Sequence, residues 1–376
     1  MEKRILIINT SAKISGAERS LIDVIDILSK SFYVILVLPD DGELFECLKT
    51  RVYLQIVPLI RIKRFNGITS MLKSISSFLN GTCQLLGLLR EHRINIIYSN
   101  TKSGQVYAAI LKAITGKYVL WHLRDNISRF HACLLGCFAN KILCVSEFIF
   151  NQVPLKRKMI VYNGVNTDLW RTDVMCSVNL KHELRLTGGT VLIGHIGQLI
   201  PWKKHDLLIE VAAQVINGGE RNVHFVIFGN DLFNEFPEYN RRLVEKIARS
   251  GLDKYISFLY KETGFIQYLD EIDIVLHLAG DEPFGRILIE GMALNKPIIA
   301  INSGGPKEIV ENNISGFLLN QEAEQIARKL KLLIDDPNLR QRLGTEGRKI
   351  VEYKFSLENL KKIQELILSI NAKHLN

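Results

Sequence analysis

Short, almost continuously apolar runs rich in β-branched residues recur along the chain and alternate with longer amphipathic segments. Buried parallel strands have this character, because helices cover both faces of the sheet and leave no polar face. Six runs lie in the first half of the chain, at 4–9, 33–39, 53–58, 94–100, 117–123 and 141–146. Five more lie at 191–197, 223–229, 255–260, 271–278 and 296–302. The pattern predicts an α/β protein with two doubly wound parallel sheets.

A polar stretch at 161–190 separates the two series and contains the turn signals Asn163-Gly164 and Gly188-Gly189. We interpret it as a linker between two Rossmann-like domains, at 1–170 and 185–355, since 376 residues exceed what one core usually organises. From about Asp335 onward the chain is helical in character, and 356–376 is predicted as a C-terminal helix. Its pattern leaves open whether it crosses back to the first domain.

Composition narrows the class of protein. Hydrophobic residues make up 47% and charged residues 23%, which is typical of a packed globular chain. A net charge of +9 indicates an anionic partner: nucleic acid, an acidic membrane surface or a phosphorylated small molecule. No zinc-finger, RNP or helix-turn-helix signature is present, so nucleic acid is not expected. No signal-peptide pattern or long apolar run is found, and we expect a cytoplasmic protein with six free, buried cysteines.

In open parallel sheets, ligands bind beyond the carboxyl ends of the strands. After the first predicted strand, Ser15-Gly16-Ala17-Glu18 opens a helix. This turn could bring backbone amides to a phosphate, or it could be a plain serine-capped turn. His122 closes the fifth predicted strand, beside Arg124 and Asp125. A lone histidine is often structural, but here it could meet a reacting group, with Asp125 orienting its ring.

In the second predicted domain, Gly197 ends a strand and Lys203 and Lys204 are expected in the first turn of a helix. Lysines are unusual there, because the helix dipole repels cations. A bound diphosphate would explain them, and two solvated surface lysines are the alternative.

Two glutamates flank a Pro-Phe-Gly turn at 283–285. Glu282 precedes a predicted helix at 286–294 and Glu290 lies two turns along it, so their side chains are expected roughly 10 Å apart. They cannot share a proton and suit two ends of an extended ligand. Ser303-Gly304-Gly305-Pro306 follows the next strand, and we expect these strand-end loops to converge. A surface helix carrying two acids is the alternative.

At these residues the chain resembles the retaining nucleotide-sugar glycosyltransferases of family 4, which have the GT-B fold. The resemblance is strongest from Ile193 to Leu319, in GHIGQLIPWKKHDLLI, EPFGRILIEGMALNKPIIA and GGPKEIVENNISGFLL. It implies that Glu290 holds the ribose hydroxyls of a UDP- or GDP-sugar. Glu282 and the amides of Phe284, Gly285 and Arg286 would contact the sugar and phosphates.

The same resemblance implies that Lys203 neutralises the diphosphate leaving group, with Gly197 also on the donor side. Gly16 would let the first-domain loop close on the donor, and His122 would lie against the donor sugar. Tyr260 and Lys261 would border the nucleobase. No metal or other cofactor is implied, and Asp40-Asp41 is interpreted as a turn.

One departure from the family pattern concerns the diphosphate. The family commonly has arginine where this chain has Gln198, and glycine where it has Lys204. Gln198 is a catalytic candidate, and Lys204 could restore the missing charge or face solvent. The function implied is metal-independent, retaining hexosyl transfer to a saccharide or lipid-linked saccharide, in synthesis of a bacterial surface polysaccharide such as lipopolysaccharide, O-antigen or capsule. A catalytically silent nucleotide-sugar-binding protein is the alternative. A dehydrogenase is a further alternative, but the glycine fingerprint that it needs after the first strand is missing from this sequence.

Residues 59–94 combine apolar positions with the basic residues Arg61, Lys63, Arg64, Lys73, Arg90 and Arg93. This segment could lie on an anionic membrane at the inner face of the plasma membrane, or it could be a crossover helix with solvated charges. A lipid-linked acceptor would favour the membrane. The sequence does not identify the donor base, sugar, linkage or oligomeric state.

Overall fold

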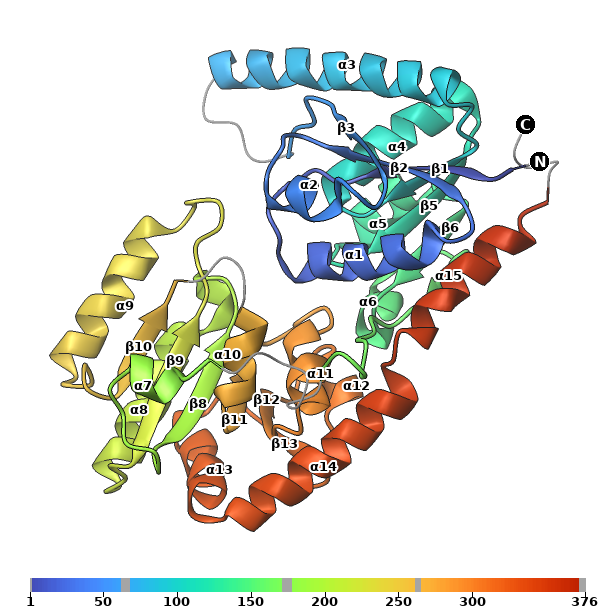
Figure 1. Ribbon diagram of the computed structural model, residues 1–376. Helices are drawn as coiled ribbons and strands as arrows, with labels where there is room; N and C mark the ends of the chain where they lie inside the picture. Colours follow the sequence, from blue (N-terminus) through green and yellow to red (C-terminus); the bar gives the residue numbers. More distant parts are fainter. Residues whose placement is uncertain (1, 62–67, 171–177, 261–264, 372–376) are drawn as a thin grey trace. The chain divides into compact units, whose positions relative to one another are not determined.

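The computed structural model describes residues 2–61, 68–170, 178–260 and 265–371. The chain divides into two units (Figure 1). The first contains the residues up to Gly164 together with the C-terminal segment from Leu357, and the second runs from Val165 to Ser356. Each unit is an α/β domain with one parallel sheet, as the sequence predicted.

The first unit has a seven-stranded sheet in the order β3-β2-β1-β4-β5-β6-β7, with all neighbours parallel. The strands are β1 Arg4–Ile8, β2 Tyr33–Leu38, β3 Tyr53–Ile56, β4 Ile96–Ser99, β5 Tyr118–Leu123, β6 Lys141–Cys144 and β7 Lys158–Ile160. The first six match the predicted runs. The edge strand β7 was missed, because it is only three residues long and partly exposed.

Helices cover both faces of this sheet. They are α1 Gly16–Leu28, α2 Glu43–Leu48, α3 Ile68–Glu91, α4 Lys102–Thr115, α5 Arg129–Gly136, α6 Glu147–Gln152 and α15 Glu358–Ser369. The C-terminal helix α15 packs beside α1 and buries Leu360, Ile363 and Ile367 in the same core (Figure 1). The last helix therefore belongs to the first unit, which settles the question its sequence pattern left open.

The second unit has a six-stranded parallel sheet in the order β10-β9-β8-β11-β12-β13. The strands are β8 Val191–Ile196, β9 Val223–Phe228, β10 Ile256–Leu259, β11 Ile274–His277, β12 Ile298–Ile301 and β13 Gly316–Leu319. The helices are α7 Leu180–Glu183, α8 His205–Asn217, α9 Pro237–Arg249, α10 Phe265–Glu271, α11 Arg286–Ala293, α12 Pro306–Ile309, α13 Ala323–Asp335 and α14 Pro337–Lys354, with a 3₁₀ turn η1 at Pro201–Lys203. The sequence missed β13, a four-residue strand directly after a turn.

The helical segment predicted from about Asp335 onward consists of two helices, α14 and α15, within the described residues up to 371. Helix α13 ends at Asp335, and Asp336 then caps α14 by accepting a hydrogen bond from the Leu339 amide at 2.9 Å. Pro337 follows at the first helical position, where its missing N–H costs nothing. A second break separates α14 from α15, at Phe355 to Leu357.

Two further expectations concern cysteines and membrane crossing. Cys144 is buried, but Cys83 and Cys137 are exposed, so the expectation of burial was wrong for these two thiols. Cys176 lies outside the described residues. Across the described ranges, no helix is both long enough and apolar enough to traverse a bilayer.

Candidate active site

Three loops meet beyond the carboxyl ends of β8, β11 and β12 in the second unit, as the sequence predicted. Lys203, after β8, donates from Nζ to Glu282 Oε2, after β11, at 2.6 Å. The amide of Gly305, after β12, donates to the Glu282 carbonyl at 2.8 Å. Glu282, which lies in the loop after β11, thus contacts the loop after β8 through its side chain and the loop after β12 through its backbone.

The ion pair of Lys203 and Glu282 is shielded from solvent, with side chains only 14% and 12% exposed. His277, the last residue of β11, places Nε2 3.2 Å from the same Glu282 oxygen. Burial would raise the pKa of Glu282, but the Lys203 ammonium and the His277 ring together lower it to about 2. The carboxylate is therefore ionised throughout the physiological range.

The structure corrects the expected position of the two lysines. They do not lie in the first turn of a helix: Lys203 ends the 3₁₀ turn η1, and Lys204 is the residue before α8, with a left-handed φ of 63°. This kink lets the chain turn so that the Lys203 side chain reaches Glu282 while Lys204 is exposed. Lys203 also lies over the Trp202 ring, 4.1 Å from its centroid.

Glycine is required where the loops after β11 and β12 touch. Gly304 has a φ of 66°, and a Cβ there would lie 2.5 Å from the Glu282 carbonyl oxygen and 2.7 Å from its nitrogen. Gly285 has a φ of 93° and precedes the first residue of α11. The first backbone amides of α11 make no i to i−4 hydrogen bonds within the helix, as in the first turn of any α-helix.

Glu290 lies on α11, as predicted, and is fully buried. Its Oε1 accepts a hydrogen bond from Arg286 Nε at 2.6 Å, one helical turn earlier. Glu282 and Glu290 therefore have different basic partners. The ring of Phe284 is buried edge-on against Phe355, with centroids 5.8 Å apart, so Phe284 can offer a ligand only its backbone.

The remaining predicted donor residues lie on neighbouring strand ends. Gly197 follows β8, and a Cβ there would lie 3.3 Å from Lys203 Cδ, so the glycine gives the lysine stem room. Gln198 is half-buried, and its carbonyl accepts a hydrogen bond from the Ile200 amide. Tyr260, after β10, is 58% exposed and stacks on Phe258 with centroids 5.6 Å apart. Lys261 lies outside the described residues.

Sequence reasoning missed two histidines of this site. His277 contacts Glu282, and His195, on β8, places Nδ1 2.9 Å from the Leu276 carbonyl and Nε2 3.0 Å from the Lys203 carbonyl. His195 therefore lies between the turn that carries Lys203 and β11, and a neutral ring donates to one of these two carbonyls. Burial lowers the pKa of His195 to about 4, so the ring is neutral. The available signal was a polar residue inside an otherwise apolar strand, which seldom occurs without a partner.

In the first unit, His122 is fully buried at the end of β5. Its Nδ1 accepts a hydrogen bond from the Tyr98 hydroxyl and lies 3.2 Å from Arg124 Nη2. Burial, together with Arg124, holds the pKa of His122 well below its usual value, so the ring is neutral. Because Nδ1 accepts hydrogen bonds, the ring hydrogen lies on Nε2. The expected orienting residue was wrong: Asp125 is exposed, and Tyr98 and Arg124 contact the ring instead.

A hydrogen-bonded chain links His122 to the turn that contains Gly16. Arg124 Nε donates to Asn100 Oδ1 at 2.6 Å, and Asn100 Nδ2 donates to Asn9 Oδ1 at 2.9 Å. Asn9 Nδ2 then lies 3.3 Å from Glu18 Oε1. Glu18 closes a capping box with Ser15 at the start of α1. The predicted capped turn is therefore present, and its acid occupies the helix N-terminus.

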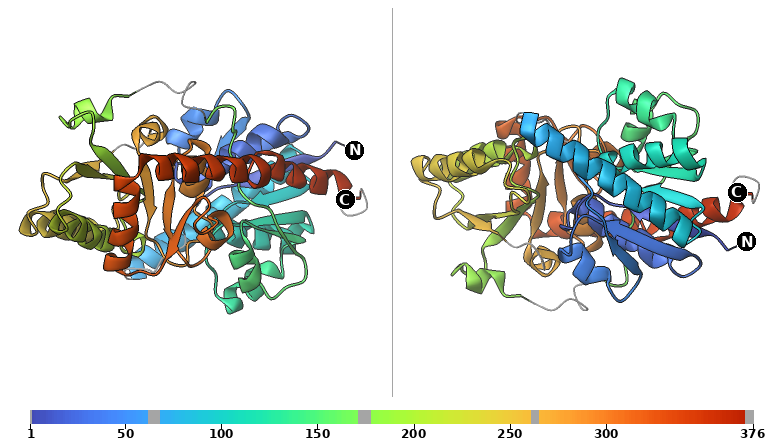
Figure 2. Two further views of the ribbon diagram at one scale, coloured as in Figure 1. Left: turned by 90° about the horizontal axis from the view of Figure 1, so that it is seen from below. Right: turned by 90° about the horizontal axis from the view of Figure 1, so that it is seen from above.

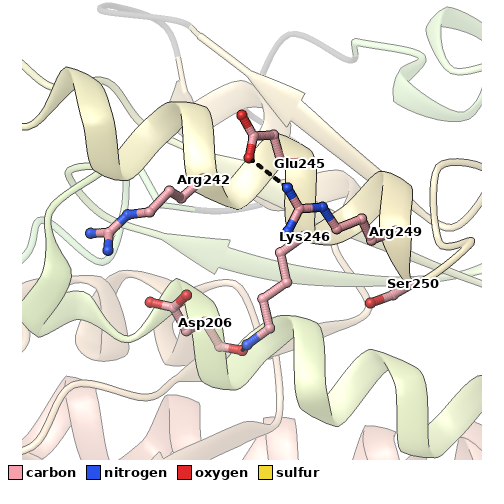
Figure 3. Close-up of a pocket in the computed structure, with 6 residues that line it drawn as sticks. All are labelled: Asp206, Arg242, Glu245, Lys246, Arg249 and Ser250. Atoms are coloured by element: carbon pink, nitrogen blue, oxygen red, sulfur yellow. Dashed lines mark hydrogen bonds and ion pairs between the residues drawn. The ribbon is translucent and has the colours of Figure 1, made fainter.

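A separate hollow of about 340 Å³ lies between α8 and α9 of the second unit (Figure 3). It is lined by Asp206, Arg242, Glu245, Lys246, Arg249 and Ser250. Figure 3 shows these side chains spread over the two helix surfaces, with Arg249 paired to Glu245 at 3.2 Å. None of the predicted site residues lines it.

The chain is similar to known glycosyltransferases in both sequence and fold. Residues 179–350 match the model of the glycosyl transferases group 1. The Anabaena protein Alr3699/HepE, solved in complex with UDP and glucose, is 25% identical and superposes with a TM-score of 0.84 over 98% of this chain and 100% of its own. The capsular polysaccharide biosynthesis glycosyltransferase CapM of Staphylococcus aureus is 25% identical over 80% of each chain. An uncharacterised glycosyltransferase of Methanocaldococcus jannaschii is 26% identical over 73% of this chain and 68% of its own.

Residues 179–350 therefore match the glycosyl transferases group 1, and the chain as a whole has the GT-B fold of solved glycosyltransferases, which agrees at that level with the resemblance stated from the sequence.

Proposed function

We propose that this protein transfers a hexose from a nucleoside diphosphate sugar to a saccharide or lipid-linked saccharide, with retention of anomeric configuration. The observation that carries the proposal is the meeting of Lys203, Glu282 and the Gly304-Gly305 turn beyond the strand ends of the second sheet. An ammonium and the backbone amides at the start of a helix are groups that bind phosphates. The Anabaena structure with UDP and glucose supports this donor class.

Lys203 stabilises the leaving group in this mechanism. Cleavage of the bond between the anomeric carbon and the diphosphate places negative charge on the leaving oxygen, and a preorganised cation lowers that barrier. The ammonium has three N–H groups, so it can donate to Glu282 and to a phosphate oxygen at once. Glu282 fixes the ammonium in place before the donor arrives, and the amides of Phe284, Gly285 and Arg286 add further donors.

The other proposed roles follow the positions of the side chains. Glu290, held by Arg286, binds the ribose hydroxyls, and the exposed ring of Tyr260 borders the base together with Lys261. Gly197 and Gln198 flank the diphosphate. In the first unit, His122 and Gly16 are the residues that we assign to the donor sugar and to its phosphates. The acceptor attacks from the face of the departing phosphate, which takes its proton, and no metal takes part.

We place the reaction in the synthesis of a bacterial surface polysaccharide, such as lipopolysaccharide, O-antigen or capsule, on the cytoplasmic side of the membrane. The similarity to CapM supports this setting.

A donor panel tests the proposal. The protein is incubated with UDP-, GDP- and ADP-sugars and a membrane extract, with and without EDTA, while release of nucleoside diphosphate is measured. We expect release with one base, unaffected by EDTA, and a product whose anomeric proton has the donor's configuration by NMR. Glu290→Ala should weaken donor binding at least tenfold, as expected when a bidentate contact to hydroxyls is lost.

Three outcomes would contradict the proposal. Donor binding without nucleoside diphosphate release would identify a silent binder, the alternative that Gln198 suggests. Inversion of configuration would refute the mechanism. Full loss of activity in EDTA, restored by a divalent cation, would refute metal independence.

A further inference from the structure

The positive charge of the chain is concentrated in one part of the first unit. Residues 101–160 contain nine Lys and Arg but only two Asp and Glu, a net charge of +7 against +9 for all 376 residues. These residues form α4, α5 and α6 with strands β5, β6 and β7, which lie next to one another at one edge of the sheet. Their helices, teal to green in Figure 2, gather at one end of the unit.

Within this basic region, α5 and the residues just after it expose large apolar side chains. Phe130 is 70% exposed, Leu134 51% and Phe138 37%. Phe130 and Leu134 are four positions apart and lie on one side of the helix, and Phe138 lies in the turn that follows the helix. Exposed phenylalanines in such a row are uncommon on a soluble surface and mark a contact site.

The inner side of α5 explains why the large residues point outward. The buried positions of the helix are Ala132 and Gly136. A Cβ on Gly136 would lie 2.5 Å from Leu155 Cδ1 and 3.0 Å from Ile142 Cδ1, so only the smallest residue fits against the sheet there. The helix therefore packs through small residues and leaves its large ones outside, the reverse of an ordinary amphipathic helix.

Basic side chains lie at both ends of this apolar row. Arg129, at the start of α5, is exposed. At the other end, Arg157 Nη1 donates to the Ala139 carbonyl at 3.1 Å and lies 3.5 Å from the Cys137 carbonyl, next to Phe138. Apolar side chains framed by cations are complementary to an anionic bilayer, since the rings enter the interface while the cations meet lipid headgroups.

We propose that Phe130, Leu134 and Phe138, with Arg129 and Arg157, form a membrane-docking surface, here called the α5 surface, that binds anionic lipid headgroups. This moves the membrane contact away from residues 59–94. Helix α3 does expose Ile75 and Leu79. Its other exposed positions from Ser76 to Gly87 are uncharged, and the exposed Arg90 lies about three turns beyond Leu79. Lys63 and Arg64, on which the sequence expectation partly depended, lie outside the described residues.

Vesicle sedimentation of the full chain tests the α5 surface without donor or acceptor, so its result is independent of the proposed reaction. One set of vesicles contains phosphatidylglycerol and phosphatidylcholine, and the other only phosphatidylcholine. We expect binding to the anionic vesicles alone, weakened at high salt. Phe130→Ser/Phe138→Ser and Arg129→Glu should each weaken binding about tenfold or more.

The matched control is Ile75→Ser/Leu79→Ser on α3, which removes two apolar side chains of similar exposure and should leave binding within twofold. All the substituted positions are exposed, and a thermal unfolding temperature equal to that of the unsubstituted protein confirms that each variant folds. Equal binding to both kinds of vesicle, or unaltered binding by the α5 variants, would overturn the proposal. So would loss of binding only in the α3 variant. Self-association that the α5 substitutions abolish, without vesicle binding, would make this surface a protein interface instead.

Discussion

Different kinds of contact form the carboxyl ends of the two sheets, although both sheets are parallel and have the same strand order over their shared strands. In the first unit, side chains from separate strand ends form a network in which Arg124 donates to Asn100 and Asn163 and contacts His122. In the second unit, glycine turns bring backbone segments together, and the side chains form ion pairs of Lys203 with Glu282 and Arg286 with Glu290.

This difference affects what the carboxyl end of each sheet can bind; we call these two ends the first edge and the second edge. At the carboxyl end of the first sheet, the imidazole of His122 is neutral and fully buried. The second edge presents a cation and backbone amides, which suit phosphates.

The largest effect is expected in the second unit. Lys203→Met removes the ammonium while keeping the side-chain length, and should lower turnover about 10²–10³-fold, with a smaller change in KM, because the charge acts on the leaving group. Nucleoside diphosphate release under saturating donor measures this. Lys204→Met is the matched control, since its side chain is exposed, and should stay within about twofold.

Loss of Lys203 also leaves Glu282 buried beside His277 without its ion-pair partner, which costs about 3–5 kcal/mol in such settings. The double variant Lys203→Met/Glu282→Gln removes both charges and should recover most of this stability without recovering turnover. Equal turnover of the Lys203 and Lys204 variants would refute the role of Lys203.

The fold could be predicted to a large extent from the sequence, because buried parallel strands have no polar face. Eleven apolar runs correspond to β1 to β6 and β8 to β12. The strands that were missed, β7 and β13, have three and four residues, and β13 directly follows a turn. Such strands are defined by pairing with a neighbour, which a local pattern does not contain.

The second edge was predictable for a related reason. Glu282, Gly285, Glu290 and Gly304 lie within about two dozen residues, so their spacing forms a motif. The partners of His122 lie at Tyr98 and Arg124, and the network continues to Asn9 and Asn163. Arg124 is near His122 in sequence, but only the folded sheet brings Tyr98, Asn9 and Asn163 to this network, and the sequence did not show that Asp125 is exposed.

Glycine substitutions sharpen the comparison. Gly304→Ala should destabilise the protein by about 1–3 kcal/mol, since its φ is 66° and the new Cβ would meet the Glu282 backbone. Gly16→Ala should leave stability unchanged or raise it by up to about 1 kcal/mol, because a Cβ there has no neighbour within 4 Å. Denaturant unfolding measures both.

Donor kinetics of the same two variants then test Gly16 itself. If the phosphates approach its amide, Gly16→Ala raises the donor KM severalfold in a protein of normal stability. An unchanged KM would show that Gly16 is only the first residue of a capped helix.

The smallest effect is expected at the first edge, in the tautomer of His122. Two donors, the Tyr98 hydroxyl and Arg124, face Nδ1, so the hydrogen should lie on Nε2. NMR of the protein with ¹⁵N-labelled histidine distinguishes the two tautomers directly. The Nε2–H signal should persist without titration from pH 8 to pH 6, because burial and Arg124 lower the pKa of His122.

Tyr98→Phe removes one of the two donors and should cost about 1 kcal/mol of stability, the usual worth of one hydrogen bond. It should also move part of the His122 population to the Nδ1–H tautomer and lower turnover by up to about tenfold, with donor binding little changed. A merely structural tyrosine would lower stability without altering the ¹⁵N spectrum of His122. An Nδ1–H tautomer in the unsubstituted protein would contradict the assignment, since Nδ1 could then not accept from Tyr98, and the first edge would present a lone pair to the sugar rather than a hydrogen.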